Sequence, residues 1–302
     1  MKEKIFSILI STKNRCEDLR LTLDKLEYLL IREDVECRVY DDGSNDGTFE
    51  YVQNNYPNIF LTRNEVTKGY LYCRNQLLNQ TKTMYAISLD DDAHFLTKNP
   101  LEKIQDYFES NPDCGLIAFR IFWGLTEPIN TASIEISQRV QSFVGCAHVW
   151  KMKAWNTIPN YPEWFVFYGE EDFASYQLFK KDWEVHYLPA IIVNHRVDLK
   201  SRKNNTDYHL RLRSSLRSGW FLCFLFYPKH LIPRKVMYSI WMQIQLKVFK
   251  GDFKVVKVII LALSDLFFSI PQILKNSNRL SEDEYIAYQK LEAAKIYWQE
   301  EG

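Results

Sequence analysis

The chain has 302 residues, of which 46% are hydrophobic, so it is long enough for one large or two modest domains with a packed core. Its 38 basic residues balance its 38 acidic ones, and its six cysteines stand far apart, which excludes a zinc or redox motif built on closely spaced cysteines. Residues 1–4 lead into a strand pattern instead of the apolar region of a signal peptide, so a cytoplasmic protein with reduced thiols is expected.

Strand and helix patterns alternate along the first part of the chain. Residues 5–10, 35–40 and 84–89 are short runs of strand-forming residues. Between the first two runs, four leucines in residues 19–30 recur at the spacing of one face of an amphipathic helix. The alternation predicts an α/β fold with a mostly parallel sheet, in which the carboxyl edge of the sheet carries the functional site.

Carboxylates directly follow two of these strands. Asp41 and Asp42 come after the second strand, and Asp90, Asp91 and Asp92 come at the end of the third. Adjacent carboxylates repel one another, so a cluster at the end of a buried strand indicates a neutralising cation, and oxygen ligands of this kind suit Mg²⁺ or Mn²⁺. A solvated acidic turn followed by a helix is the alternative explanation for the segment Asp90 to Asp92 taken by itself.

Five short segments, in their order and spacing, resemble the family 2 glycosyltransferases. The segments are residues 7–15, 41–44, 68–69, 74–75 and 89–92. The resemblance covers roughly residues 4–196. It implies a GT-A fold, which is a single nucleotide-binding α/β domain, and transfer of a hexose-type sugar with inversion from a nucleotide-diphosphate donor, with a UDP-sugar favoured.

The resemblance also implies roles for individual residues. It assigns the donor site to Thr12, Arg15, Asp41, Asp42, Arg74, Asp90 and Asp91. Within this set, Asp42 is expected to accept from the nucleotide base, and Arg74 to reach the nucleotide or its diphosphate. Asp90 and Asp92 are expected to form the Asp-x-Asp pair of the family, and Asp92 to ligate Mn²⁺ or Mg²⁺.

Inversion in a single displacement needs a base that takes the proton of the acceptor hydroxyl. The acidic run that follows Gly169 resembles the family segment that supplies this base. Counting back from Trp183 favours Glu171, whereas literal Glu-Asp identity favours Asp172, and both remain candidates. The alternative is that these acids only complement the dipole at the start of a helix.

Two histidines complete the predicted site. His195 ends a strand pattern and matches a metal-ligating histidine of several family members, whereas the alternative is a hydrogen-bonded structural histidine. His94 lies in an insert that displaces the usual proline to Pro100. It is either an extra ligand or a ribose contact, and the sequence leaves its role open.

The C-terminal part differs in charge from the rest. Residues 196–257 hold fourteen Lys and Arg against three Asp and Glu, whereas residues 1–195 hold 20 basic and 28 acidic residues. We therefore predict a GT-A domain over residues 1–200 and a basic, aromatic helical module over 201–302 that lies on an anionic membrane surface or binds the acceptor. The aromatic side chains expected to enter the membrane are Trp220, Phe221, Phe224, Phe226 and Trp241. Ordinary helical core, a homo-oligomer contact and a true membrane span are the alternatives.

These observations favour an inverting, metal-dependent glycosyltransferase that acts on a lipid-linked or polysaccharide acceptor. The resemblance to the family and the short layout with a C-terminal tail imply a bacterial protein, so a peripheral location at the inner face of the plasma membrane is expected. The acidic catalytic face argues against nucleic acid as a partner. A catalytically inactive GT-A-like scaffold and a nucleotidyltransferase on a related fold remain the competing hypotheses.

Overall fold

The computed structural model of the protein describes residues 3–198 and 207–295. Its strands are β1 (Phe6–Thr12), β2 (Val35–Asp41), β3 (Phe60–Arg63), β4 (Tyr85–Asp90), β5 (Ala93–Phe95), β6 (Cys114–Trp123), β7 (Gln138–Val140), β8 (Ala147–Lys151) and β9 (Glu184–His195). Its α-helices are α1 (Cys16–Leu30), α2 (Thr48–Asn55), α3 (Tyr70–Gln80), α4 (Pro100–Ser110), α5 (Met152–Trp155), α6 (Glu170–Phe179), α8 (Tyr208–Phe226), α9 (Ile232–Leu246), α10 (Lys254–Phe268), α11 (Ile270–Asn276) and α12 (Glu282–Gln289). The domain boundary predicted between residues 200 and 201 lies outside the described residues.

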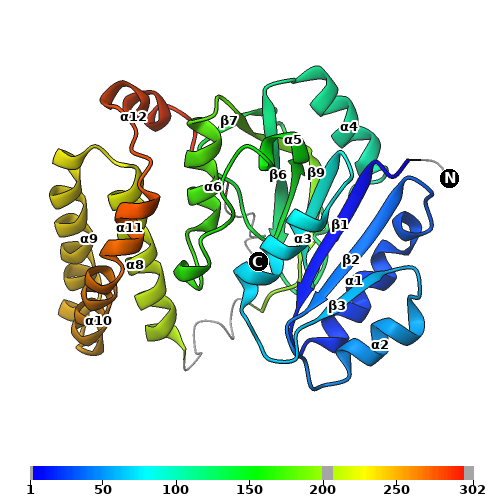
Figure 1. Cartoon of the computed structure of the whole chain (residues 1–302), viewed down its shortest axis with the longest axis horizontal. Coiled ribbons are helices and arrows are strands. Elements are labelled where there is room, and N and C mark those ends of the chain that lie inside the picture. The colour runs from blue at the N-terminus through cyan, green and yellow to red at the C-terminus, as the bar shows by residue number, and fades with distance from the viewer. Residues whose placement is uncertain (1–2, 199–206, 296–302) are drawn as a thin grey trace.

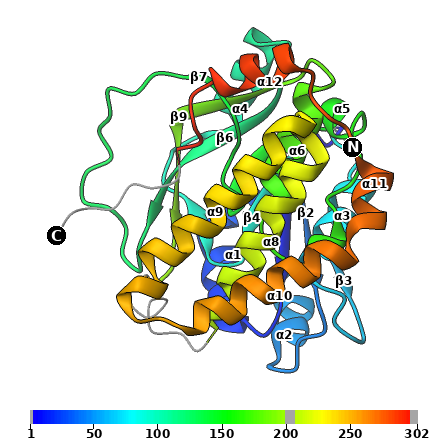
Figure 2. The same ribbon diagram turned by 90° about the vertical axis from the view of Figure 1, so that its left-hand side faces the viewer.

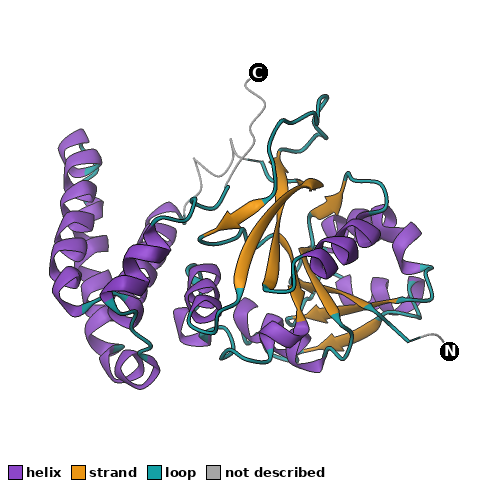
Figure 3. Cartoon of the chain, turned by 90° about the horizontal axis from the view of Figure 1, so that it is seen from above, coloured by secondary structure: helices purple, strands orange, loops and turns teal. Residues whose placement is uncertain are grey.

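The strands form one mixed sheet in the order β3-β2-β1-β4-β8-β6-β9-β5, with β7 paired to β9 (Figures 1 and 3). The N-terminal half, from β3 to β4, is parallel as predicted. Beyond β4, β6 and β9 pair in parallel and the remaining pairings are antiparallel, so the sheet is mixed. The α/β fold class is confirmed.

The parallel half brings the acidic strand ends together. In the register of the sheet, Thr12 of β1 lies beside Asp41 of β2, and Ser11 lies beside Asp90 of β4. Helix α1 covers this half through buried leucines such as Leu19 and Leu23, which recur with the predicted helical spacing. Because the core behind the strands is apolar, the polar residues gather at the carboxyl edge of the sheet.

The helical module packs tightly on the α/β domain. Helix α8 lies against α6, and the ring of Phe226 contacts those of Phe173 and Tyr176 (Figure 1). Trp220 and Phe221 are also buried, with 2% and 1% of their surface exposed. The prediction that these three aromatic side chains enter a membrane is therefore wrong, because the α/β domain and the neighbouring helices cover them.

Helices α9 and α10 form the outer layer of the module on the side away from the sheet, and α11 lies against α8 (Figures 1 and 2). Within the described residues, no single helix is long and apolar enough to cross a membrane, whereas α10 and α11 together meet the criteria of length and composition but are bent by 55°. After α12 the chain returns to the sheet, where Glu292 pairs with Val140 of β7.

Candidate active site

A pocket of about 490 Å³ opens at the carboxyl edge of the parallel strands. The predicted site residues that line it are Thr12, Arg15, Asp42, Asp90, Asp91, Asp92 and His195. They come from the ends of β1, β2, β4 and β9 and from the start of α1. The parallel register explains this convergence. It places the carboxyl ends of β1, β2 and β4 at one edge of the sheet, and the polar residues come directly after these ends.

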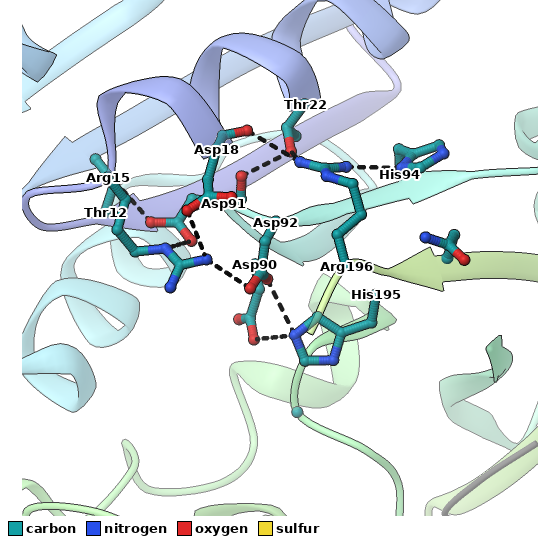
Figure 4. A network of polar contacts seen from close by, with 12 residues as sticks. Thr12, Arg15, Asp18, Thr22, Asp90, Asp91, Asp92, His94, His195 and Arg196 are labelled. Atoms are coloured by element: carbon teal, nitrogen blue, oxygen red, sulfur yellow. Dashed lines mark hydrogen bonds and ion pairs between the residues drawn. The ribbon is translucent and has the colours of Figure 1, made fainter. Parts of the chain in front are cut away.

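Asp90, Asp92 and His195 form a compact group in this pocket (Figure 4). One ligand atom from each residue lies within 4.8 Å of the others, and His195 Nε2 is 3.0 Å from Asp92 Oδ1 and 3.8 Å from Asp90 Oδ2. Burial lowers the pKa of His195, but the Cys146 thiol and the Asp92 carboxylate outweigh it and raise the pKa to about 11. Two carboxylates and an imidazole suit Mn²⁺ or a similar divalent cation, provided that the imidazole proton leaves.

Asp91 points away from this group and is buried. Its Oδ2 accepts a hydrogen bond of 2.7 Å from Thr12, and its Oδ1 lies 2.8 Å from Arg15 Nε. Burial raises the pKa of Asp91 to about 7, although the Arg15 charge opposes the shift. Arg15 Nη2 also lies 2.6 Å from Asp92 Oδ2, so Arg15 connects the buried carboxylate of Asp91 with that of Asp92 (Figure 4).

Arg74 stands directly behind Asp90. Its Nη2 donates to Asp90 Oδ1 at 2.7 Å and to the Gly145 carbonyl at 2.6 Å, and its guanidinium stacks 4.4 Å from the ring centre of Tyr70. Its Nη1 is buried and has no hydrogen-bond partner among the described residues. Arg74 therefore orients Asp90, while one donor stays unused close to the pocket.

The two aspartates after β2 have different surroundings. Asp42 lines the pocket, and its carboxylate accepts from the side chains of Asn64 and Thr67 and from the backbone amides of Lys68 and Gly69. Burial opposes the charged form, but these bonds outweigh it and lower the pKa of Asp42. Asp42 thus holds the loop before α3, and its contact with a nucleotide base stays a prediction.

Asp41 lies outside the pocket. It is completely buried, accepts from the backbone amide of Ser44 at 2.9 Å and lies 3.4 Å from Arg63 Nε. The donor contact predicted for Asp41 is therefore not supported by its position, because its carboxylate is committed to the turn that follows β2.

The acidic run at the start of α6 faces two directions. Glu171 lies against Gly145 near Arg74, and burial together with the Glu170 charge raises its pKa well above the usual value. Asp172 is exposed and lies on the side of α12, where its charge adds to burial in raising the pKa of Tyr288. Of the two predicted bases, Glu171 is thus the one that shares the surroundings of Arg74 and Asp90.

His94 is engaged in contacts other than the two that the sequence left open. It is buried, and its Nδ1 accepts from Arg196 at 2.7 Å while its Nε2 lies 3.1 Å from Glu127 (Figure 4). Arg196 Nη2 also donates a hydrogen bond of 2.6 Å to Thr22 Oγ1 of α1. His94 therefore belongs to a polar network that ties β5, β9 and α1 together beside the pocket.

Several residues of the site were not predicted from the sequence. Tyr70, Val166 and Phe167 also line the pocket, and Glu170 is buried beside Arg74. Val166 has φ 68° and ψ −52°, and the Phe167 amide donates to the Phe165 carbonyl at 2.8 Å, which defines a strained γ-turn. The only local signal for this segment was its run of aromatic residues.

Three solved structures illustrate the structural likeness. They are GalNAc-T7 with UDP, GalNAc and Mn²⁺ (TM-score 0.60, 13% identity, 90% of this chain and 58% of that chain), S. aureus TarS (0.54, 15%, 72% and 40%) and the mannosyltransferase PcManGT from Pyrobaculum calidifontis with GDP-Man and Mn²⁺ (0.55, 13%, 96% and 79%). The chain thus spans 58% of the length of GalNAc-T7 and 40% of that of TarS. At these identities the likeness concerns the fold, and it confirms the GT-A architecture.

Among curated proteins, none matches the sequence. The sequence model described as glycosyl transferase family 2 matches residues 7–178, which include the acidic strand ends and the start of α6. Because this match covers more than half of the 302 residues, the chain belongs to glycosyl transferase family 2.

Proposed function

We propose that this glycosyltransferase moves a hexose-type sugar from a nucleotide-diphosphate sugar to a hydroxyl group of an acceptor, with inversion at the anomeric carbon. The observation that carries the proposal is the placement of the Asp90, Asp92 and His195 group in a pocket next to two arginines, with the carboxylate of Glu171 close to the second arginine. One region thus contains ligands for a cation, a base for the acceptor hydroxyl, and positive charge that can stabilise a diphosphate.

The residues of this region have different roles in the proposed reaction. Asp90, Asp92 and His195 would hold a divalent cation, and the cation supplies Lewis-acid stabilisation of the leaving diphosphate when bound. Arg15 and Arg74 keep the carboxylates oriented, and Thr12 and Asp42 shape the wall of the pocket. The raised pKa of Glu171 makes its carboxylate a stronger base toward the acceptor hydroxyl.

The choice of substrates rests on the family. We favour UDP as the nucleotide and either Mn²⁺ or Mg²⁺ as the cation. For the acceptor we favour a hydroxyl group of a lipid-linked glycan or of a polysaccharide. The pocket of about 490 Å³ is within the range of small-molecule sites.

Thermal stabilisation tests the donor site first. The protein is heated with UDP, GDP or ADP, each with Mn²⁺, with Mg²⁺ and with chelator, and we expect the largest increase in melting temperature for UDP with a cation. Stabilisation by none of these pairs would overturn the proposal of a nucleotide-diphosphate site.

Product analysis tests the stereochemistry. Transfer from an α-linked UDP-sugar to a hydroxyl acceptor is followed by proton NMR of the anomeric centre, and inversion predicts a β-linked product. An α-linked product would contradict a single displacement. Formation of a new nucleotide-diphosphate sugar from a sugar phosphate would instead identify a nucleotidyltransferase.

A further inference from the structure

The outer face of the helical module carries large apolar side chains that no part of the described chain covers. On α10 the residues Val255, Val258, Ile259, Ala262 and Leu266 are buried and form the stripe toward α8. Apolar residues nevertheless continue around the helix, with Ile260, Leu263 and Phe267 exposed. Large apolar side chains that stay exposed on successive turns of one helix indicate a surface that a partner covers.

The same apolar character continues along α9 and the turn before α10. Trp241 of α9 is 51% exposed, and Phe249 and Phe253 in the turn are 69% and 74% exposed. Figure 2 looks onto this side, where α9 and α10 lie nearest the viewer and meet at the turn. We call Trp241, Phe249, Phe253, Ile260, Leu263 and Phe267 the outer apolar face. These side chains extend over two helices and the turn that joins them, so they are not isolated exposed residues.

The exposed charges on the segment that carries this face are all positive. Between residues 232 and 276, all of which the structure describes, the exposed charged residues are Arg234, Lys235, Lys250, Lys254, Lys257 and Lys275. The two acids of this stretch are paired toward the protein: Asp252 lies 3.0 Å from His209, and Asp265 accepts from Arg213 at 2.7 Å. The surface therefore combines an apolar centre with a cationic surround.

We propose that the outer apolar face is a docking surface for an anionic lipid membrane, on which α9 and α10 lie in the plane of the interface. Anionic headgroups meet the lysines, and the aromatic and aliphatic side chains enter the acyl boundary. The cytoplasmic leaflet carries such lipids, which agrees with the location expected at the inner face of the plasma membrane. The inference stands on this surface and is independent of the proposed sugar transfer.

Two other occupants fit the surface less well. In a two-fold dimer the same patch faces itself, so Lys250 and Lys254, which flank Phe249 and Phe253 in the chain, would come close to the same lysines of the other copy. A spanning arrangement of α10 and α11 would need apolar surroundings on every side, whereas one side of α10 is packed against α8 and the pair is bent by 55°. A membrane surface accommodates both the positive charge and the one-sided exposure.

Flotation of the full-length protein with lipid vesicles tests the proposal. Vesicles of phosphatidylcholine are compared with vesicles that contain 30% phosphatidylglycerol, at low and high salt. We expect binding to the anionic vesicles, weakening at high salt without complete release, because the apolar contacts are not screened. Absence of flotation with anionic vesicles at low salt would overturn the proposal, as would equal binding to both kinds of vesicle.

Matched variants separate the two contributions. Lys250→Gln with Lys254→Gln should lower partitioning to anionic vesicles about 30-fold, since each lysine near such a surface contributes roughly fivefold. Phe249→Ser with Phe253→Ser should abolish the binding that survives high salt. The controls, Lys82→Gln with Lys103→Gln and Ile134→Ser with Ile136→Ser, change exposed residues of the α/β domain and should bind like the wild type.

Sedimentation tests whether a second copy of the chain covers the outer apolar face. Sedimentation of the lipid-free protein should show a monomer, and the Phe249→Ser, Phe253→Ser variant should sediment in the same way. If the wild type is a dimer and this variant is a monomer, the outer apolar face binds a second copy of the chain and the membrane proposal is overturned. An unchanged circular dichroism spectrum and melting temperature of every variant shows that a loss of flotation is not a loss of folding.

Discussion

The carboxylate of Glu171 rests against Gly145, so closely that a Cβ atom at position 145 would lie 2.5 Å from Glu171 Oε1. No real Cβ atom sits at such a distance from an oxygen, so the two residues are sterically coupled. The Gly145 carbonyl also accepts from Arg74, which in turn holds Asp90. The short segment before β8 therefore positions both the proposed base and the Asp-x-Asp pair.

This coupling predicts that Gly145→Ala displaces Glu171 and lowers turnover by roughly 10- to 100-fold, because a misplaced catalytic group loses its alignment with the substrate. Nucleotide binding, measured by calorimetry, should change little. Combining Gly145→Ala with Glu171→Asp, which shortens the side chain, should recover part of the loss. Wild-type turnover in Gly145→Ala would show that Glu171 has room to move without consequence.

The different directions of Glu171 and Asp172 predict different kinetic effects. Glu171→Gln should lower turnover by about 10²-fold or more, because the amide has no basicity, while donor binding stays near normal. Asp172→Asn should keep turnover within a few-fold of the wild type, since its side chain lies on the α12 side. The opposite ranking of the two variants in a steady-state assay would assign the base to Asp172.

The group formed by Asp90, Asp92 and His195 predicts metal-dependent donor binding. Asp92→Asn should abolish transfer and remove the effect of Mn²⁺ or Mg²⁺ on the affinity for UDP, because it removes one charged ligand from a site with three. Asp106→Asn, which changes an exposed carboxylate of α4, is the matched control. Calorimetric titration with UDP, with and without the cation, measures both variants, and full activity of Asp92→Asn or of wild type in excess chelator refutes the assignment.

His148 predicts part of the pH dependence of stability. It is completely buried on β8, and burial together with the Arg74 charge lowers its pKa well below the usual value. The unfolded chain therefore binds a proton below about pH 6.5 that the folded chain does not bind, so stability falls as the pH decreases, by at most about 1.4 kcal/mol per pH unit for this group.

Urea unfolding between pH 7.5 and 5 checks this expectation. The free energy of unfolding of His148→Gln should depend less steeply on pH than that of the wild type, whatever its absolute stability. His230→Gln, which changes an exposed histidine, is the matched control for the substitution itself. Equal slopes for all three proteins would show that His148 does not contribute.

Local patterns of the sequence predicted much of the fold and of the pocket. Leu19 and Leu23 recur with the helical period, and Asp90 and Asp92 follow a run of strand formers, so helix, strand and acidic edge were all readable from neighbours in the chain. The direction of strands β5 to β9 was not readable in this way. Strand direction depends on the path of the connecting segments, which short-range periodicity does not encode.

The sequence by itself determined the types of elements, the acidic carboxyl edge and the charge of the C-terminal module, because these follow from the order and chemistry of neighbouring residues. Only the tertiary structure decided that Asp42 and not Asp41 lines the pocket, and that His195 contacts Asp92. It also decided that Trp220 is covered while Trp241 is exposed. Each of these outcomes depends on which surfaces pack together. Packing joins residues that are distant in the chain, and it buries one aromatic side chain while leaving another of equal hydrophobicity in contact with solvent.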